Sequence, residues 1–255
     1  ALKLGSLELT GNVLQWAITG VGAYIVICWM QSLYLRDKPA FAVIVKQPST
    51  SILIALAALQ TVLNYGVMSW TAVYAIQHFN RTPAEIGLQF GALITSLGII
   101  GPLIAGPVSD WTTQRFKGGR LYVTLIALTI SPFLAIGVYT AETITGFYAW
   151  FVAYSLVLTM WLPPVYAALI DLVMPRMRGM VMSYYILMMT ITGMGLGPYA
   201  VGMMSDINGG NLGEAILRLY WIAPIIVVLI AILIWRMPKD EAILLDRAKA
   251  AGEPV

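Results

Sequence analysis

The chain has 255 residues, of which 59% are hydrophobic and only 11% are Asp, Glu, Lys or Arg. Soluble domains carry about 25% charged residues, so this chain has too few charges to cover the surface of a soluble fold. The composition therefore excludes a soluble enzyme and a disordered chain, and a single cysteine, Cys28, excludes a disulfide-stapled domain. The net charge of +3 does not indicate a nucleic-acid partner, because the basic residues do not gather on a soluble face.

The charged residues are clustered, and long uncharged segments lie between them. A membrane-spanning helix needs roughly 20 mostly apolar residues, and seven segments meet this requirement and nearly fill the chain. Lipid offers no hydrogen-bonding partners, so each backbone must bond within itself as a helix. We therefore predict an all-α membrane protein with seven transmembrane helices, which lie in segments 9–35, 47–80, 86–109, 121–141, 143–170, 179–205 and 219–235.

The lysines and arginines predict the orientation of these helices. Twelve of the 15 lie in the loops after the first, third and fifth spans or in the C-terminal tail, and three lie on the other side. Because basic residues are retained on the cytoplasmic side, we expect the tail in the cytoplasm. This pattern predicts an integral protein of a bacterial inner membrane. The first residue is Ala rather than Met, and we expect a fragment or a processed chain.

The second span carries a polar stripe. At 100° per residue, Gln60, Asn64, Thr71, Tyr74 and His78 fall within an arc of about 80°. Polar side chains that face lipid are costly, so the stripe faces either a water-filled cavity or another helix with which it hydrogen-bonds. Both remain open, and the first four residues are candidates for contact with a substrate. His78 lies near the outer interface and is expected to be structural.

The third and sixth spans are rich in small residues, which let helices approach closely. We predict that Gly193, Gly197 and Gly202 of the sixth span are helix-packing positions. The sequence leaves open whether this contact is static or slides. The third span is expected to start at a capping box formed by Thr82 and Glu85.

The fifth span combines aromatic residues with a proline pair. Tyr154 and Trp161 lie on one face, and Trp161 is too deep for an interfacial anchor. Pro163 and Pro164 remove two backbone donors and are expected to bend or loosen the helix. Interrupted membrane helices often flank binding sites, but they are also found as simple kinks. Tyr154 and Trp161 therefore join the candidates for a substrate cavity.

The predicted spans lack acidic residues and known catalytic motifs. No carboxylate lies within the seven segments, and no hydrolase, phosphate-loop or metal-ligand motif occurs in the sequence. We therefore expect no enzyme activity, no cofactor and no metal site.

The loop after the third span carries a motif. It reads Gly106-Pro-Val-Ser-Asp110, followed by Trp111 and, further on, Arg120. This pattern resembles the loop signature of the major facilitator superfamily, G-x-x-x-D-(R/K)-x-G-(R/K)-(R/K), and departs from it at Trp111. A second block, from Pro175-Arg-Met-Arg178-Gly179 to Ser205-Asp206, is similar to the eleventh helix of the spinster-like branch of that family.

The resemblance implies a fold of two six-helix bundles around a central cavity that opens to each side in turn. In that arrangement residues 1–35 are the last helix of a missing N-terminal half, and 36–50 are a cytoplasmic linker. Residues 51–236 are the C-terminal six-helix bundle, and 237–255 are a cytoplasmic tail. The resemblance also implies a cytoplasmic gate, for which the candidates are Gly106, Asp110, Arg120, Asp171 and Arg178.

The function implied is secondary transport of a small amphipathic or lipid-like molecule by alternating access, together with the missing half. Two alternatives remain. One is a proton-coupled symporter of a polar organic anion or a sugar-like solute. The other is a non-transporting membrane subunit or a truncated fragment, since half a transporter has half a cavity.

Overall fold

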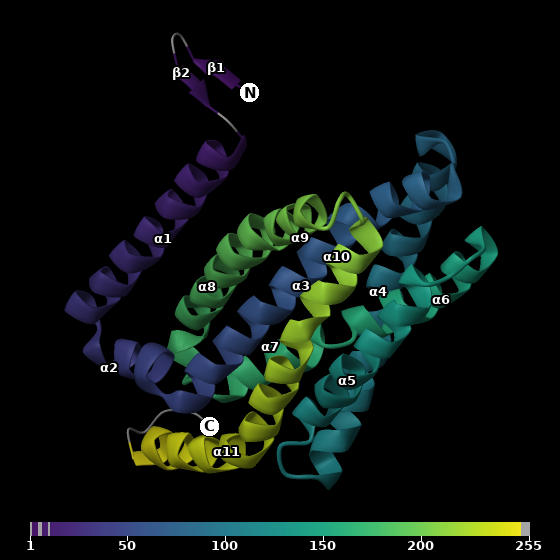
Figure 1. Cartoon of the computed structure of the whole chain (residues 1–255). Helices are drawn as coiled ribbons and strands as arrows, with labels where there is room; N and C mark the ends of the chain where they lie inside the picture. The colour runs from purple at the N-terminus through teal and green to yellow at the C-terminus, as the bar shows by residue number, and fades with distance from the viewer. Residues whose placement is uncertain (1, 5–6, 10, 251–255) are drawn as a thin grey trace.

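A computed structural model describes residues 2–4, 7–9 and 11–250 of the chain, with side-chain surroundings for 13–38 and 40–243 (Figure 1). It is a bundle of helices preceded by a hairpin, in which β1 (Leu2–Leu4) pairs with β2 (Leu7–Leu9) in antiparallel register. The sequence pattern does not predict this hairpin, because three-residue strands are too short for a periodicity to be recognised.

Seven helical segments in the described part of the chain are long and apolar enough to cross a membrane, which confirms the predicted fold class. Several of them contain a break or a change of helix type. The spans are α1 (Gly11–Arg36); α3 (Pro48–Phe79); α4 (Pro83–Arg115); α5 (Arg120–Tyr139); α6 (Ile144–Thr159) with α7 (Leu162–Asp171); α8 (Arg178–Met189), a π-helical turn (η3, Thr190–Met194) and α9 (Gly195–Ile207); and α10 (Leu212–Leu219), a 3-10 turn (η4, Tyr220–Ile222) and α11 (Ala223–Ala250).

The connecting segments are more helical than the sequence indicates. The predicted linker 36–50 contains α2 (Lys38–Phe41) and a π-helical turn (η1, Ala42–Lys46). A short 3-10 turn (η2, Pro175–Met177) precedes α8. Helix α11 continues from the last span into the predicted tail as far as Ala250, and residues 251–255 lie outside the described part of the chain.

Two local features set the direction of the chain at helix ends. Thr82 and Glu85 form the predicted capping box, because each side chain bonds to the backbone N–H of the other. Helix α11 bends in its last third, where it runs across the lower edge of the bundle (Figure 1). Pro238 lies inside this helix and cannot donate to the carbonyl of Ile234, which accounts for the bend.

Helix α3 is the centre of the bundle. Of its most apolar stretch, 61% is buried, against 6% for α1. It packs against α8, η3, α9, α10 and α11. Helix α1 lies along the outside of α8 and α9 (Figure 1), where Trp29 stacks on Tyr184 with ring centres 5.0 Å apart. The core is therefore built around α3, and α1 is an added helix on one face.

Glycines allow α3 and α9 to come into backbone contact. A Cβ at Gly197 would lie 2.6 Å from the carbonyl oxygen of Val62 and 2.7 Å from the amide nitrogen of Gly66. Gly193 is equally crowded by the side chain of Thr61, and a Cβ at Gly202 would lie 3.2 Å from the indole of Trp70. The three predicted packing glycines thus lie along one seam between α3 and the sixth span.

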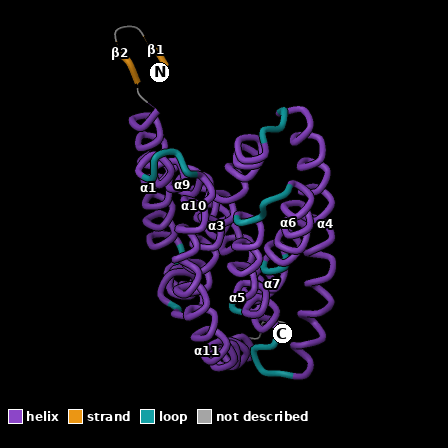
Figure 2. The backbone as a smooth tube through the Cα atoms, turned by 45° about the vertical axis from the view of Figure 1, so that its right-hand side comes forward, coloured by secondary structure: helices purple, strands orange, loops and turns teal. Residues whose placement is uncertain are grey.

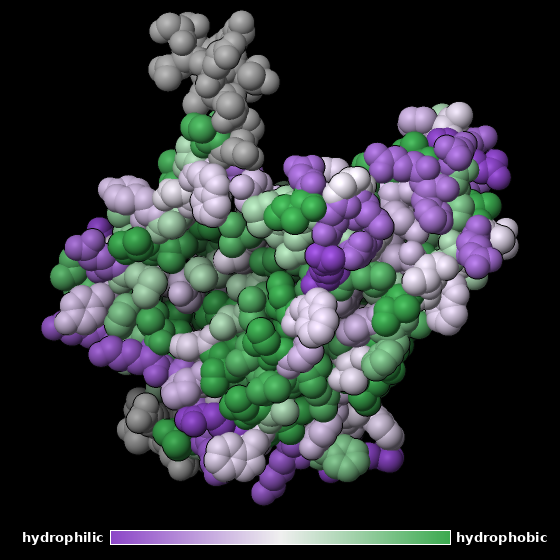
Figure 3. Space-filling view, viewed as in Figure 1, coloured by the Kyte–Doolittle hydropathy of each residue, from purple (hydrophilic) through white to green (hydrophobic). Residues whose placement is uncertain are grey.

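The loops gather at two ends of the bundle (Figure 2). One end, here called the basic end, holds α2, η1, the α4–α5 turn, the α7–α8 connection and the last third of α11. The other is called the opposite end and holds the α3–α4, α5–α6 and α9–α10 connections. On the face seen in Figure 3, hydrophobic side chains cover the middle of the bundle, as expected of a surface in contact with lipid.

The α3–α9 contact predicts the effect of a methyl group at Gly197. The substitution Gly197→Ala forces the two backbones apart and is expected to cost about 1–3 kcal/mol of stability, measured by unfolding in mixed detergent micelles. Gly106→Ala is the matched control, since no atom lies within 4 Å of its Cβ position, and alanine favours the helix by up to about 1 kcal/mol. Equal effects of both substitutions would contradict the assigned contact.

Candidate functional site

A cavity of about 300 Å³ opens between α3, α4, α6, α7 and α8, in the middle of the bundle. Two of the predicted cavity residues, Asn64 and Trp161, contribute to its wall. Most of the wall is apolar, with a few neutral polar side chains. The lining residues are Thr61, Asn64, Tyr65, Met68, Ile94, Gly98, Pro102, Ser155, Leu158, Thr159, Trp161, Leu162 and Met189.

The cavity lies at the break in the fifth span. Helix α6 ends at Thr159 and α7 begins at Leu162, so the predicted interruption is confirmed. Pro163 and Pro164 follow directly and cannot donate to the carbonyls of Thr159 and Met160. Trp161 sits within the break and is only 2% exposed. The interruption thus places a large aromatic ring in the wall of the cavity.

A second helix interruption begins directly after a residue of the cavity wall. The π-helical turn Thr190–Met194 follows Met189, which lines the cavity. Pro198 lies four residues after Met194, and its ring clashes with that carbonyl in a regular helix. A π-helical turn is a common way to absorb such a conflict, often near functional sites. The amide of Gln15 on α1 donates to the carbonyl of Gly195 at the same place.

Several hydrogen-bonding groups in the wall lack a partner. The hydroxyl of Ser155 is buried and makes no hydrogen bond with a described residue. Pro102 has no N–H, so the carbonyl of Gly98, one turn earlier and also in the wall, receives no helical bond from it. None of the lining residues is charged or a histidine. This wall therefore suits a ligand that combines an apolar group with a neutral hydrogen-bonding group.

Two other predicted residues of the second span bond to a neighbouring helix. The hydroxyl of Thr71 lies 2.6 Å from the hydroxyl of Tyr139, and Tyr74 donates to the carbonyl of Tyr139 at 2.9 Å. Both residues are buried, and Tyr139 is the last residue of α5. Tyr74 thus supplies a donor to a helix-end carbonyl. The polar stripe therefore lines the cavity at Asn64 and bonds α3 to α5 at Thr71 and Tyr74.

Two more predicted residues are buried away from the cavity wall. The hydroxyl of Tyr154 lies 2.5 Å from that of Tyr220, which joins α6 to the turn before α11. Gln60 is 1% exposed, and its amide nitrogen makes no hydrogen bond with a described residue. His78 stacks on Tyr74 with ring centres 5.1 Å apart.

Sequence reasoning missed several residues of the wall. Ser155 follows Tyr154, and Thr159 lies one helical turn beyond it and two residues before Trp161. Pro102 in the middle of the third span was a usable signal, because an interior proline leaves a carbonyl free at the fourth residue before it. Small hydroxyl residues are common in membrane helices and give no such signal.

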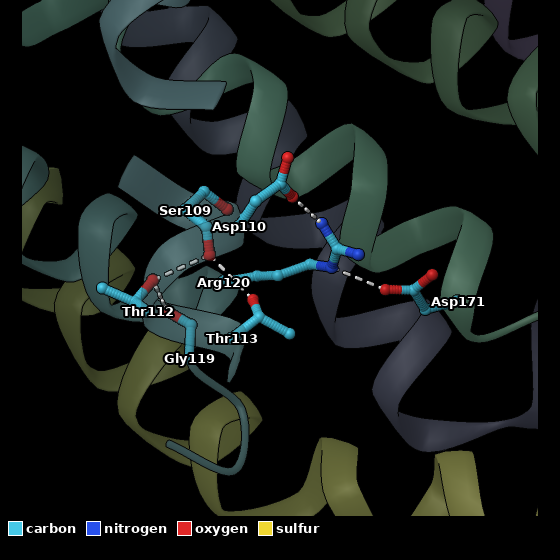
Figure 4. A network of polar contacts seen from close by, with 7 residues as sticks. All are labelled: Ser109, Asp110, Thr112, Thr113, Gly119, Arg120 and Asp171. Atoms are coloured by element: carbon cyan, nitrogen blue, oxygen red, sulfur yellow. Dashed lines mark hydrogen bonds and ion pairs between the residues drawn. The ribbon is translucent and has the colours of Figure 1, made fainter. Parts of the chain in front are cut away.

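An ion-pair network occupies the basic end (Figure 4). Arg120 donates from Nη1 to Asp110 at 2.8 Å and from Nε to Asp171 at 2.7 Å. Thr112 closes the α4–α5 turn by contacting the carbonyls of Ser109 and Gly119, at 2.8 and 2.9 Å. The network connects the ends of three helices: α4, α5 and α7.

Two of the three charges of this network stand at unfavourable ends of their helices. Arg120 is the first residue of α5, where the helix dipole is positive, and Asp171 is the last residue of α7, where it is negative. Each charge is stabilised by the opposite charge on another helix rather than by its own. Arg120 and Asp171 are 23% and 29% exposed, whereas Asp110 is 63% exposed, so the bond to Asp171 is the better shielded.

The remaining predicted gate residues take no part in this network. Arg178 is exposed at the start of α8 and forms no ion pair within the described part of the chain. Gly106 has open space around its Cβ position. No group of three or more His, Cys, Asp or Glu side chains in the described residues is placed to hold a metal ion.

Comparison with known proteins identifies the family of this fold. The model of the Major Facilitator Superfamily matches residues 50–253. The chain belongs to the Major Facilitator Superfamily. It is an integral membrane protein, as its seven apolar helices and this family indicate. The family is one of transporters rather than of enzymes.

The chain spans about half the length of the relatives that it matches. An MFS-type efflux pump of Mycolicibacterium smegmatis is 24% identical over an alignment of 197 residues that covers 71% of this chain and 46% of the pump. Two crystal structures of a bacterial homolog of the human lysosomal transporter Spinster, both inward-facing, share the fold. The unoccupied form has a TM-score of 0.60 at 22% identity and the occupied form 0.56 at 20%, covering 82% and 80% of this chain and 48% of each structure.

The ion-pair geometry predicts unequal effects of removing charges in this superfamily member. Arg120→Gln leaves Asp171 without a partner and is expected to cost about 1–2 kcal/mol of stability. A double-mutant cycle of Arg120→Gln with Asp171→Asn measures the coupling in detergent-mediated unfolding, with an expected value of about 1 kcal/mol. Arg178→Gln is the control and is expected to change stability by less than about 0.5 kcal/mol. A coupling free energy of zero between Arg120 and Asp171 would contradict a stabilising ion pair.

Proposed function

We propose that this chain is the C-terminal half of a secondary transporter that moves a small amphipathic or lipid-like molecule across the membrane by alternating access. The family match supports transport. The observation that carries the substrate class is the cavity between α3, α4 and α6–α8, whose described wall is apolar, aromatic and uncharged. An anion or a strongly hydrated sugar would leave its charge or hydroxyls poorly matched by such a wall.

The partner that we propose is an N-terminal half that closes the other side of the cavity. Two facts support it: the chain covers less than half the length of each of the relatives described above, and one cavity of about 300 Å³ is at the lower limit for a small-molecule site. We propose that the basic end faces the cytoplasm of a bacterial cell, with the C-terminus there, because it carries 12 of the 15 basic residues.

The network at the basic end is the proposed cytoplasmic gate. Arg120 connects Asp110 of α4 with Asp171 of α7, and α4 and α7 both line the cavity. A movement of α7 relative to α4 therefore strains or breaks one of the two bonds. Interfacial ion pairs of about 1 kcal/mol are large enough to shift two conformations that differ by a few kcal/mol. Gly106, through the loop signature, and Arg178, through the block that begins at Pro175, remain proposed members of the gate.

A substitution that fills the cavity tests the transport site. In proteoliposomes with the complete transporter, Ser155→Leu is expected to lower uptake of a fluorescent single-chain amphiphile by roughly tenfold or more, because the added bulk costs 1–3 kcal/mol at the site. Ser183→Leu is the matched control, since Ser183 is exposed on α8 and bonds only to its own helix. Equal uptake by both variants contradicts the cavity, and no uptake by the unmodified transporter favours the non-transporting alternative.

The gate is tested by removing one charge. In the reconstituted complete transporter, Asp110→Asn is expected to shift the balance between inward-facing and outward-facing states, because Arg120 then keeps only Asp171. Cysteine crosslinks placed across each mouth report the shift as opposite changes in yield at the two ends. Unchanged crosslinking at both mouths is the outcome that would reject the gate.

A further inference from the structure

A second hollow, of about 470 Å³, lies between α3, α9 and the start of α10 at the opposite end of the bundle. It shares no lining residue with the cavity described above, and on α3 its residues Trp70 and Gln77 follow Met68, the last α3 residue of that cavity. Its wall differs in chemistry, since it contains a carboxylate. The proposed transport function makes no use of this hollow.

One face of each helix forms the hollow. Tyr199, Gly202, Met203 and Asp206 of α9 line it, at spacings of three, four and seven residues. Such residues lie on one face of a helix. In this wall, Gly202 lies one helical turn before the carboxylate of Asp206, and the ring of Tyr199 lies two turns before it.

The aromatic rings of the hollow are held in place from behind. The indole nitrogen of Trp70 on α3 donates to the carbonyl of Pro198 at 2.8 Å. Gly202 leaves room for this indole, since a Cβ there would lie 3.2 Å from its ring. Tyr199 is contacted edge-to-face by Trp16 of α1, with ring centres 5.7 Å apart. Both Trp70 and Tyr199 thus have fixed positions in the wall of the hollow.

The carboxylate of Asp206 has no counter-ion. It forms no ion pair with a described residue, and it is the last residue but one of α9, where the helix dipole adds negative potential. The nearest charged residues along the chain, Glu214 and Arg218 of α10, pair with each other at 2.6 Å. Figure 3 shows hydrophilic side chains over the junction of α9 and α10. Among the described side chains, the opposite end carries four carboxylates, Glu85, Glu142, Asp206 and Glu214, against two arginines, Arg81 and Arg218.

We propose that this hollow binds an organic ammonium group, as found in choline, either in a free solute or in a lipid headgroup. Aromatic faces attract a cation through the ring quadrupole, and they attract a weakly hydrated quaternary ammonium group in particular. Asp206 supplies the balancing negative charge, and Trp70 and Tyr199 supply the rings. A metal cation such as Ca²⁺ or Mg²⁺ fits this hollow poorly, because one carboxylate gives too few oxygen ligands.

The test compares choline with its uncharged carbon analogue, dimethylbutanol, which has the same shape. Binding of each to the purified chain is measured calorimetrically in a detergent without ammonium groups. Choline is expected to bind at least about fivefold more tightly than the analogue. The substitution Asp206→Asn is expected to weaken the binding of choline about fivefold and to leave the binding of the analogue unchanged. Glu214→Gln is the control and is expected to have no effect, because Glu214 lies outside the hollow.

Two results would overturn the proposal: equal binding of choline and its analogue, or an unchanged choline affinity in Asp206→Asn. Asp206 is exposed and makes no hydrogen bond to another described side chain, so this variant is expected to keep the melting temperature of the unmodified chain. Nanodiscs of phosphatidylglycerol and of phosphatidylcholine separate the two sources. Free choline binding in both supports a solute site, and binding in phosphatidylglycerol alone supports a lipid headgroup site, whereas binding in neither counts against both.

Discussion

The contact between the backbones of α3 and α9 at Gly66 and Gly197 constrains the rest of the bundle. Close packing continues on either side of it, since Gly193 meets Thr61 and a Cβ at Gly202 would lie 3.2 Å from the indole of Trp70, so the sixth span follows α3 along one seam. Beside this seam, Asn64 and Met68 of α3 line the cavity toward α4, α6, α7 and α8. Trp70 and Gln77, further along α3, line the hollow toward α9 and α10. The seam therefore holds in place the helix on which both candidate binding sites are built.

The membrane adds a second constraint, since a buried polar group there has no water to bond with. The hydroxyls of Thr71, Tyr74 and Tyr154 meet this constraint by pairing across helices, and they fasten α5, α6 and the start of α11 to their neighbours. Ser155 does not meet it, and its hydroxyl adjoins the cavity. A polar group without a hydrogen-bonding partner that adjoins a cavity distinguishes the wall of a binding site from a packed helix interface. The residue type alone does not make this distinction.

The sequence predicts properties of a single helix better than contacts between helices. The seven spans follow from apolar length, and the break near Pro163 follows from lost backbone donors, so both appear in the structure as expected. The polar stripe of α3 shares one face by helical periodicity, but its neighbours change along the helix: the cavity borders Asn64, and Tyr139 of α5 bonds to Thr71. Sequence periodicity fixes a direction around one helix axis, whereas the partner in that direction depends on how the other helices cross it.

The positions of the two helix interruptions indicate where the bundle can bend. The α6–α7 break and the π-helical turn after Met189 both border the cavity, and each lies beside backbone carbonyls that have lost a regular partner. By contrast, α3 runs without a change of helix type and without a proline after its first turn, and its Tyr74 is bonded to the end of α5 at Tyr139. Bending costs least where helical bonds are already missing. We therefore propose that a change in cavity shape arises from α7 and the π-helical turn moving against α3, and that Arg120, at the start of α5, responds to the movement of α7 through Asp171.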